Sequence, residues 1–357
     1  MSWTLVGQDA AVAVLKGAVA SERVAHAYLF AGPKRVGKTV AALQFAQLLN
    51  CTGAEPPCRS CRACERVAGG AHPDVEMIGI GGLCKPKPHE SQHDHSQDNS
   101  RDIKICQMRR LQELISRAPF EARYRVIIVE PADALGREAT AALLKTLEEP
   151  PPYVVIILVT DREELLPDTI RSRARRVGFA GLPASEIERT LRTRWDVDPP
   201  RAAELARLSG GRLGWAVAAL HDERMMEQRE QALDRAEALA SAPLAERFVY
   251  AGALGGSYTK DRAGVQSVLE MWQEWWRDIL LIAAGRADHA VHGDRLDRLR
   301  ALASQCEVAG AVRALRAITD ARQQLAENAS PVLALEAMML ALPELRSNAV
   351  SQRLAGR

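Results

Sequence analysis

The sequence has few aromatic residues and almost no excess of charge of either sign. Aromatic residues make up 4% of its 357 residues, and the formal net charge is only +2 at pH 7. The near-neutral charge excludes a general polycation that coats nucleic acid, so any basic surface has to be local. The scarcity of aromatic side chains also argues against a protein that binds single strands mainly by stacking on their bases.

Long apolar runs and an obvious targeting signal are also lacking. The apolar run at 154–160, VVIILVT, is far shorter than the roughly 20 residues that a membrane-spanning helix needs. The stretch MSWTLVGQDAAVAV has no basic segment followed by an apolar core, so we expect no secretory signal. The expected location is therefore the cytoplasm, without membrane association.

The order of apolar patterns predicts an α/β part followed by an all-α part. Strand-like runs stand at 25–32, 74–80, 124–130 and 153–160, and a helical pattern occupies 38–50. Continuous apolar strands separated by helices indicate a parallel sheet that is covered on both faces. After 178–183 the strands stop, and three short helices are predicted at 184–195, 200–211 and 212–223, followed by longer amphipathic helices from about 224. Among the latter, Trp272, Trp275 and Trp276 fall at core spacing and are expected to pack helices together.

The segment at 85–101, KPKPHESQHDHSQDNSR, contains no Val, Ile, Leu or aromatic residue. Such a composition cannot bury itself, so we expect a flexible, solvated loop. Its His89, His93 and His95 could in principle bind metal, but the solvated loop is the favoured interpretation.

The stretch AGPKRVGKTV contains the pattern of a phosphate-binding loop, with Gly32, Gly37, Lys38 and Thr39 at the required spacing. Glycines let backbone N–H groups surround phosphate oxygens, the lysine reaches the β and γ phosphates, and the hydroxyl completes a magnesium shell. An apolar strand precedes the loop and a helix follows it, which is the context that the motif needs. We therefore expect binding of ATP or ADP, with Mg²⁺.

The strand that normally supplies the catalytic carboxylates ends here with Glu130 and Pro131. Glu130 can still reach a magnesium-bound water, but proline has neither a side-chain acceptor nor an N–H group with which to position the attacking water. Loss of a general base costs roughly 10² to 10⁴-fold in rate. Asp133 is a conceivable substitute, although we expect it to cap the helix that follows. The site is predicted to hold nucleotide without hydrolysing it at an appreciable rate.

Four arginines crowd the stretch at 165–177: Arg171, Arg173, Arg175 and Arg176. A solvated basic turn is the favoured interpretation for Arg175 and Arg176. For Arg173 a catalytic role is the alternative, because an arginine at a subunit boundary can stabilise the charge that develops on the γ-phosphate of a neighbouring subunit.

Four of the seven cysteines gather within fourteen positions, at Cys51, Cys58, Cys61 and Cys64. Two adjacent C-x-x-C steps with a fourth cysteine nearby are typical of a closed, tetrahedral zinc site with a structural role. Free or redox-active thiols are the alternative. The remaining Cys84, Cys106 and Cys306 lack partners in sequence and are interpreted as ordinary thiols.

Taken together, these motifs resemble the AAA+ clamp-loader family of the bacterial DNA polymerase III holoenzyme. The similarity includes the opening stretch at 6–39, the string ALLKTLEEPP at 142–151, and LPDTIRSRA at 166–174. In the last string Ser172 and Arg173 match the arginine-finger segment, while Ala174 stands where cysteine is usual. ENASPVLALEAMMLAL at 327–342 is similar to the closing helices, through Asn328, Leu333, Leu335 and Glu336.

The resemblance implies three domains: an AAA+ P-loop domain at 1–178 with a zinc module at about 51–64, a small helical lid at 179–222, and a helical collar at 223–357. It places Gly7 and Gln8 near the adenine pocket and Thr160 at the polar sensor position. It further implies a ring with gamma/tau motor subunits and a delta subunit, which loads the sliding clamp onto primer-template DNA.

Within that family the chain is expected to be a non-motor stator that supplies Arg173 to a neighbour. Gly214 stands where motor subunits carry a nucleotide-sensing arginine, although Arg212 is close. The isolated chain is thus not expected to be an ATPase, while the holoenzyme around it would hydrolyse ATP and make DNA. The alternatives are an ATP-hydrolysing motor subunit of the gamma/tau type and a stand-alone nucleic-acid-binding P-loop protein.

Overall fold

The computed structural model describes residues 3–82, 84, 95, 102–327 and 329–345. The chain divides into two compact units, one of Met1–Ile187 with Gly211–Trp215 and one of Glu188–Gly210 with Ala216–Arg357. Each has a hydrophobic core of its own. Of the segment at 85–101 only His95 is among the described residues, and Asn328 lies outside them.

The first unit contains a five-stranded parallel sheet in the order β2-β3-β4-β1-β5. The strands are β1 (Ala27–Ala31), β2 (Val75–Ile78), β3 (Arg125–Val129), β4 (Val154–Thr160) and β5 (Arg175–Gly178). The first four confirm the predicted strands. β5 corrects the expectation of a basic turn: it is an edge strand in which only Val177 is buried, so its arginines hide the usual apolar signal.

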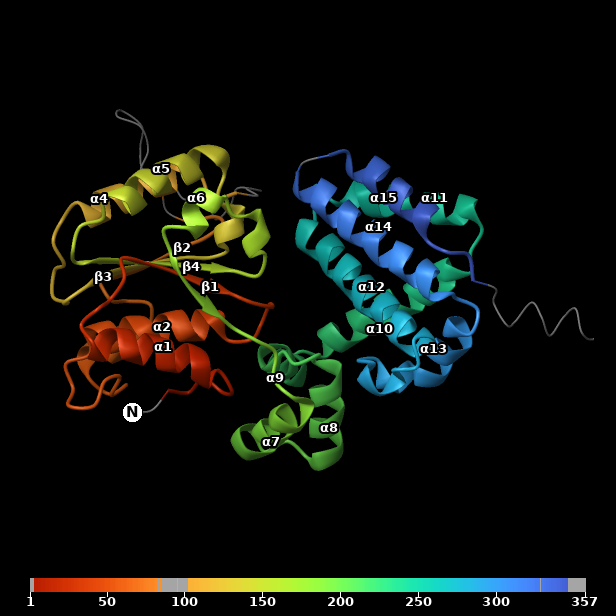
Figure 1. Ribbon diagram of the computed structural model, residues 1–357, viewed down its shortest axis with the longest axis horizontal. Helices are drawn as coiled ribbons and strands as arrows, with labels where there is room; N and C mark the ends of the chain where they lie inside the picture. The colour runs from red at the N-terminus through yellow and green to blue at the C-terminus, as the bar shows by residue number, and fades with distance from the viewer. Residues whose placement is uncertain (1–2, 83, 85–94, 96–101, 328, 346–357) are drawn as a thin grey trace, which may run out of the picture. The chain divides into compact units, whose positions relative to one another are not determined.

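Helices cover both faces of this sheet (Figure 1), with α1 (Asp9–Ala20) and α2 (Lys38–Asn50) on one side and α4 (Ile105–Ile115) and α5 (Arg137–Glu148) on the other. Neighbouring strand residues point to opposite faces. Phe30 accordingly packs in the same core cluster as Phe45 of α2, whereas Leu29 shares a cluster with Leu111 of α4. The α/β fold expected from the sequence, a parallel sheet with helices on both faces, is confirmed.

Among the described residues of the first unit there are also two short α-helices, α3 (Arg62–Ala68) and α6 (Asp168–Arg171). α3 begins directly after Cys61 and contains Cys64, and Gln47 of α2 donates a hydrogen bond to the Cys64 carbonyl at 2.8 Å. Asn50 exchanges hydrogen bonds of 2.9 Å with the backbone of Tyr124. These buried amides attach the cysteine-rich module to the sheet domain.

The rest of the described chain is helical. Its helices are α7 (Ala184–Trp195), α8 (Pro199–Leu208), α9 (Leu213–His221), α10 (Glu223–Ala240), α11 (Leu244–Ser257), α12 (Arg262–Ala283), α13 (Leu296–Ala303), α14 (Val308–Ala326) and α15 (Pro331–Ala341). The first three of these confirm the short helices predicted at 184–223. No helix within the described ranges combines the length and apolarity needed to cross a bilayer.

The core of α10–α15 is built around large apolar side chains. Trp272, Trp275 and Trp276 are each at most 2% exposed, which confirms that they pack helices together. The buried guanidinium of Arg247 donates to the carbonyls of Ala240, Ala242, Leu342 and Pro343. Through these four hydrogen bonds Arg247 joins the end of α10 to the segment that follows α15.

Candidate functional site

The predicted phosphate loop lies between the carboxyl end of β1 and the start of α2, with Gly37 as the helix N-cap in a left-handed conformation. Gly32 has φ +154°, and a Cβ atom there would lie 2.2 Å from the carbonyl oxygen of Phe179. Only glycine therefore allows the loop to pass this close to the chain that leaves β5. The N–H groups at the start of α2 point toward the loop and favour an anion there.

Lys38 belongs to the same loop and is only 6% exposed. Its ammonium group donates to the carbonyl of Gly32 at 2.7 Å and to that of Pro33 at 2.6 Å. Burial lowers its pKa, while the carboxylates of Asp161, Glu130 and Asp133 act in the opposite direction. The cation lies where phosphate oxygens would take over from the two loop carbonyls.

The two side chains that the sequence analysis expects to bind magnesium, Thr39 and Glu130, lie in contact. Thr39 donates its hydroxyl hydrogen to a carboxylate oxygen of Glu130 at 2.7 Å, although the two residues are 91 positions apart. A hydroxyl and a carboxylate are the groups that hold Mg²⁺ in P-loop sites. The next residue, Pro131, follows a cis peptide bond and offers no polar atom beyond its carbonyl.

Asp133 does not cap the next helix, so this prediction was wrong. α5 has Gly136 as its N-cap and no side-chain cap. Asp133 is instead turned into the domain, 1% exposed, where it accepts from the Thr160 hydroxyl at 2.7 Å and from Nε of Arg162 at 3.0 Å. Its carboxylate is thus engaged by Thr160, which stands at the expected sensor position, and by Arg162, which the sequence analysis did not identify.

Gly7 and Gln8 lie against the chain that follows β5. The Gln8 amide donates to the Ala180 carbonyl at 2.7 Å and accepts from the Ala180 N–H at 3.2 Å. A Cβ atom on Gly7 would lie 2.3 Å from a methyl group of Leu182. The two residues therefore fix the opening segment to the end of the sheet domain, and their part in an adenine pocket stays a prediction.

Gly214 approaches the phosphate loop closely. Its N–H donates to the carbonyl of Arg35 at 2.9 Å, and an added Cβ atom would lie 2.7 Å from that same oxygen. Any side chain at this position would push the loop backbone away. Close packing against the phosphate loop thus explains why glycine stands at this position. A nucleotide-sensing arginine does not fit here without displacing the loop.

Arg173 lies just after α6 and is half-exposed. Its guanidinium donates to the Thr169 carbonyl at 3.0 Å and to Glu148 at 3.1 Å. Glu148 comes from the ALLKTLEEPP string and is 54% exposed. Of the other arginines in the run, Arg171 pairs with Asp168 and Arg176 forms a two-point contact with Glu163. Arg173 is therefore held by a weak, solvent-accessible pair.

The four clustered cysteines converge. Their sulfur atoms all lie within 4.8 Å of one another, and those of Cys51 and Cys61 are 4.0 Å apart. Backbone N–H groups point at the sulfurs, from Cys58 to Cys51 at 3.3 Å and from Cys61 to Cys58 at 3.3 Å. Burial opposes ionisation of Cys61, but hydrogen bonds from Cys64 and Thr52 outweigh it and lower its pKa to about 5. Four sulfur atoms gathered in this way fit a tetrahedral zinc ion, which is commonly bound by four cysteines.

A second group of potential metal ligands was not expected. His95, predicted to be solvated, is 7% exposed, and Cys84 is fully buried. Together with Cys106 they place three ligand atoms within 4.8 Å of one another. The sequence analysis interpreted Cys84 and Cys106 as ordinary thiols and did not expect them to lie beside His95, while His89 and His93 lie outside the described residues. The intervals between these residues match no metal motif, so the sequence carried no signal.

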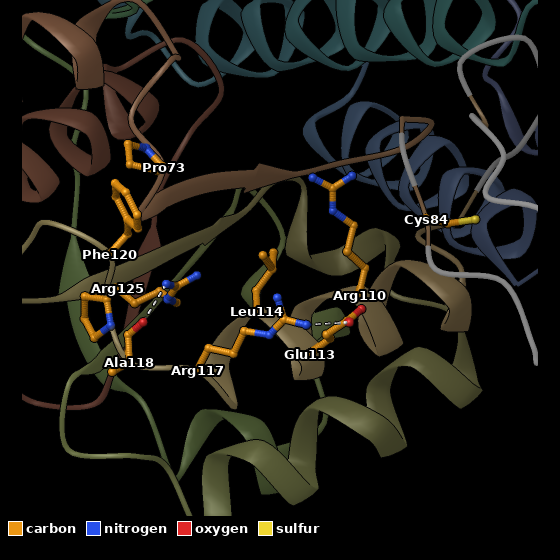
Figure 2. Close-up of a pocket in the computed structure, with 10 residues that line it drawn as sticks. Pro73, Cys84, Arg110, Glu113, Leu114, Arg117, Ala118, Phe120 and Arg125 are labelled. Atoms are coloured by element: carbon orange, nitrogen blue, oxygen red, sulfur yellow. Dashed lines mark hydrogen bonds and ion pairs between the residues drawn. The ribbon is translucent and has the colours of Figure 1, made fainter.

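An arginine-lined cavity of about 830 Å³ lies beside α4 (Figure 2). Its three arginines each face an acid: Arg110 pairs with Glu76 at 2.7 Å, Arg117 with Glu113 at 3.3 Å, and Arg125 with Asp74 at 2.9 Å. Their charge is largely compensated, so the cavity is not a strong anion site. Asp74 also accepts from three backbone N–H groups, at 120–122, and fixes the start of β3.

Comparisons with known proteins place the chain in a family. The family model described as DNA polymerase III, delta subunit, matches residues 7–183. A delta-prime subunit of DNA polymerase III from Bacillus subtilis is 28% identical over 94% of this chain and 96% of its own length. The delta-prime subunit of Pseudomonas aeruginosa is 32% identical over 63% of this chain and 66% of its own. The tau subunit of Bacillus subtilis is 34% identical but matches only 51% of this chain and 30% of its own length. Since similarity to the Bacillus subtilis delta-prime subunit runs nearly end to end and similarity to tau does not, the chain belongs to the delta-prime family of DNA polymerase III clamp-loader subunits.

Proposed function

We propose that the chain is the non-motor subunit of a DNA polymerase III clamp loader and that it supplies Arg173 to the ATP site of an adjacent motor subunit. Family membership supports the clamp-loader role. The position of Arg173 on the sheet domain is the observation that carries the proposal of action on a neighbour.

Arg173 is too far from its own phosphate loop to act there. Arg175, two residues later, pairs with Tyr28 in the parallel sheet, whereas the loop begins at Gly32 beyond the other end of β1. Four residues of parallel strand span about 13 Å, and Arg173 lies further back still. This separation from its own loop supports action of Arg173 on the phosphates of another molecule.

The residues of the chain's own nucleotide site support binding of a nucleotide without its hydrolysis. Lys38, Thr39 and Glu130 are placed to bind phosphates and Mg²⁺. Pro131 supplies no base, and the carboxylate of Asp133 is engaged by Thr160 and Arg162. ATP or ADP bound here would serve as a structural ligand, with Gly7 and Gln8 near its base.

The four-cysteine module is proposed to bind one zinc ion through Cys51, Cys58, Cys61 and Cys64. All four positions of a tetrahedron would then be filled by sulfur, which leaves none for a substrate. The ion would add folding energy to a small module that has little apolar core of its own.

The lid at 179–222 and the collar at 223–357 are proposed to place the chain in a ring with gamma/tau motor subunits and a delta subunit. Through that complex it would contact the sliding clamp and primer-template DNA in the cytoplasm. The rival proposal, a gamma/tau-like motor, draws on the intact Lys38 and Thr39. Pro131 and the close packing of Gly214 on Arg35 count against it.

Reconstitution of the loader with and without this chain tests the proposal. Purified motor and delta subunits are mixed with the chain, and complex formation and clamp loading onto primed DNA are measured. We expect the chain to enter the complex stoichiometrically and loading to depend on it. Loading at an unchanged rate in its absence would contradict the assigned role.

A further inference from the structure

Three side chains with metal-binding atoms converge beside the carboxyl end of β2, away from the four-cysteine module in the sequence. They are Cys84, His95 and Cys106, and their ligand atoms lie within 4.8 Å of one another. Nε2 of His95 is 3.0 Å from the sulfur of Cys106. Figure 2 shows Cys84 at the margin of the arginine-lined cavity, with its sulfur directed away from the labelled arginines.

The backbone holds these residues in place from two elements. The N–H of His95 donates to the Gly82 carbonyl at 2.8 Å, which places the histidine next to the turn that follows β2. Cys106 stands in the first turn of α4, and its neighbour Gln107 connects that turn to the same segment. Gln107 accepts from the Lys104 N–H and donates to the Gly79 carbonyl, both at 2.8 Å. The cluster is thus supported by contacts that do not depend on a metal.

Burial makes the cluster unusual. Cys84 is 0% and His95 7% exposed, although the histidine comes from a stretch without large aliphatic or aromatic residues. A thiol–imidazole hydrogen bond explains the pairing of His95 with Cys106, but it does not explain why a second thiol joins them. Two thiols and an imidazole are, however, a donor set that zinc prefers.

The distances allow a shared ion. With Zn–S near 2.3 Å and Zn–N near 2.0–2.1 Å, tetrahedral ligands lie about 3.5–3.8 Å from each other. The ligand atoms observed within 4.8 Å need only small side-chain movements to reach that spacing. Three ligands leave a fourth position for water or a further side chain.

We propose that Cys84, His95 and Cys106 form a second zinc site, distinct from the four-cysteine module. The ion would join the turn after β2 to the start of α4. This turn lies next to the strand end of the nucleotide site, because the Glu130 N–H donates to the Ile78 carbonyl at 2.9 Å. The site would therefore stabilise the sheet edge beside the magnesium-binding carboxylate.

The zinc content of the full-length chain tests this proposal. The protein is purified with a thiol reductant, dialysed against metal-free buffer and analysed by elemental mass spectrometry. We expect two zinc ions per chain for the wild type and for the control variant Cys306→Ser, whose thiol lies in the helical core. The double variant Cys84→Ser/Cys106→Ser should retain one. One ion in the wild type, unchanged in the double variant, would overturn the proposal.

A second measurement does not depend on the folding of any variant. The metal-free wild-type chain is alkylated under reducing conditions with and without added zinc, and modification of each cysteine is followed by mass spectrometry. We expect zinc to protect Cys84 and Cys106 by at least about tenfold, as bound thiolates lose their reactivity, and to leave Cys306 unchanged. Protection confined to the four-cysteine module would mean that the second cluster is only a hydrogen-bonded group of thiols.

Discussion

Replacing Arg173 by alanine should disable a neighbour's ATP site while leaving this chain folded. In the resting chain Arg173 donates to Glu148, and the two side chains are 37% and 54% exposed. An exposed pair of this kind contributes only about 0.2–1 kcal/mol. Removing it should therefore change the free energy of unfolding by less than about 1 kcal/mol.

The expected effect on hydrolysis is much larger. An arginine finger contributes about 10³ to 10⁵ in rate, which corresponds to about 4–7 kcal/mol of transition-state stabilisation. Releasing the guanidinium from Glu148 takes up only a small part of that energy. We expect Arg173→Ala to lower the DNA-stimulated ATPase of the reconstituted loader at least about tenfold, with normal complex formation.

The assay is steady-state phosphate release by the complex with primed DNA and the clamp present. Arg176→Ala is a matched control, because Arg176 stands three residues away in the same run and pairs with Glu163 on its own domain. We expect this control to keep nearly full activity. An Arg173→Ala complex as active as wild type would refute the assignment, as would an equal loss in both variants.

Three further predictions concern stability and the nucleotide site. Asp74→Ala should lower the free energy of unfolding by about 3–5 kcal/mol in chemical denaturation, because it leaves buried Arg125 without its partner. Burial alone would raise the pKa of Asp74, but hydrogen bonds from backbone N–H groups and the charge of Arg125 lower it. The stabilisation that the Asp74 carboxylate contributes is therefore complete above about pH 4 and is lost as pH falls through the folded-state pKa. The free energies of unfolding of wild type and variant should converge in acid. Chelation of zinc should lower the melting temperature of the wild type, and Cys58→Ser/Cys61→Ser should make that response smaller. Gly214→Arg should weaken ATP binding at least about tenfold in a fluorescent-nucleotide titration, since a side chain there displaces the loop carbonyl of Arg35; unchanged affinity would show that the close packing is irrelevant to the loop.

The sheet domain was largely predictable because its signals are local. Unbroken runs of Val and Ile predicted β3 and β4, and the spacing of the phosphate-loop motif predicted the turn between β1 and α2. The edge strand β5 was not predicted, since Arg175 and Arg176 face solvent and only Val177 is buried. A strand that buries one residue leaves too little periodicity to detect.

The contacts that define the site were harder to predict because they join distant segments. No local pattern shows that Asp133 turns toward Thr160 and Arg162 rather than toward the helix that follows it. Nor does composition show that a polar stretch places a buried His95 beside the thiols of Cys84 and Cys106. Both depend on which strand ends meet at one edge of the sheet, and this is settled only by the tertiary fold.

The most direct test of the central claim is steady-state ATP hydrolysis by the isolated chain beside ATP binding by the same preparation. Lys38→Ala serves as the control, because Lys38 is the phosphate-binding cation of the loop. The account predicts that ATP binding depends on Lys38 and that turnover by the wild type is indistinguishable from that of the variant. Brisk turnover that Lys38→Ala abolishes would contradict it and would identify the chain as a motor.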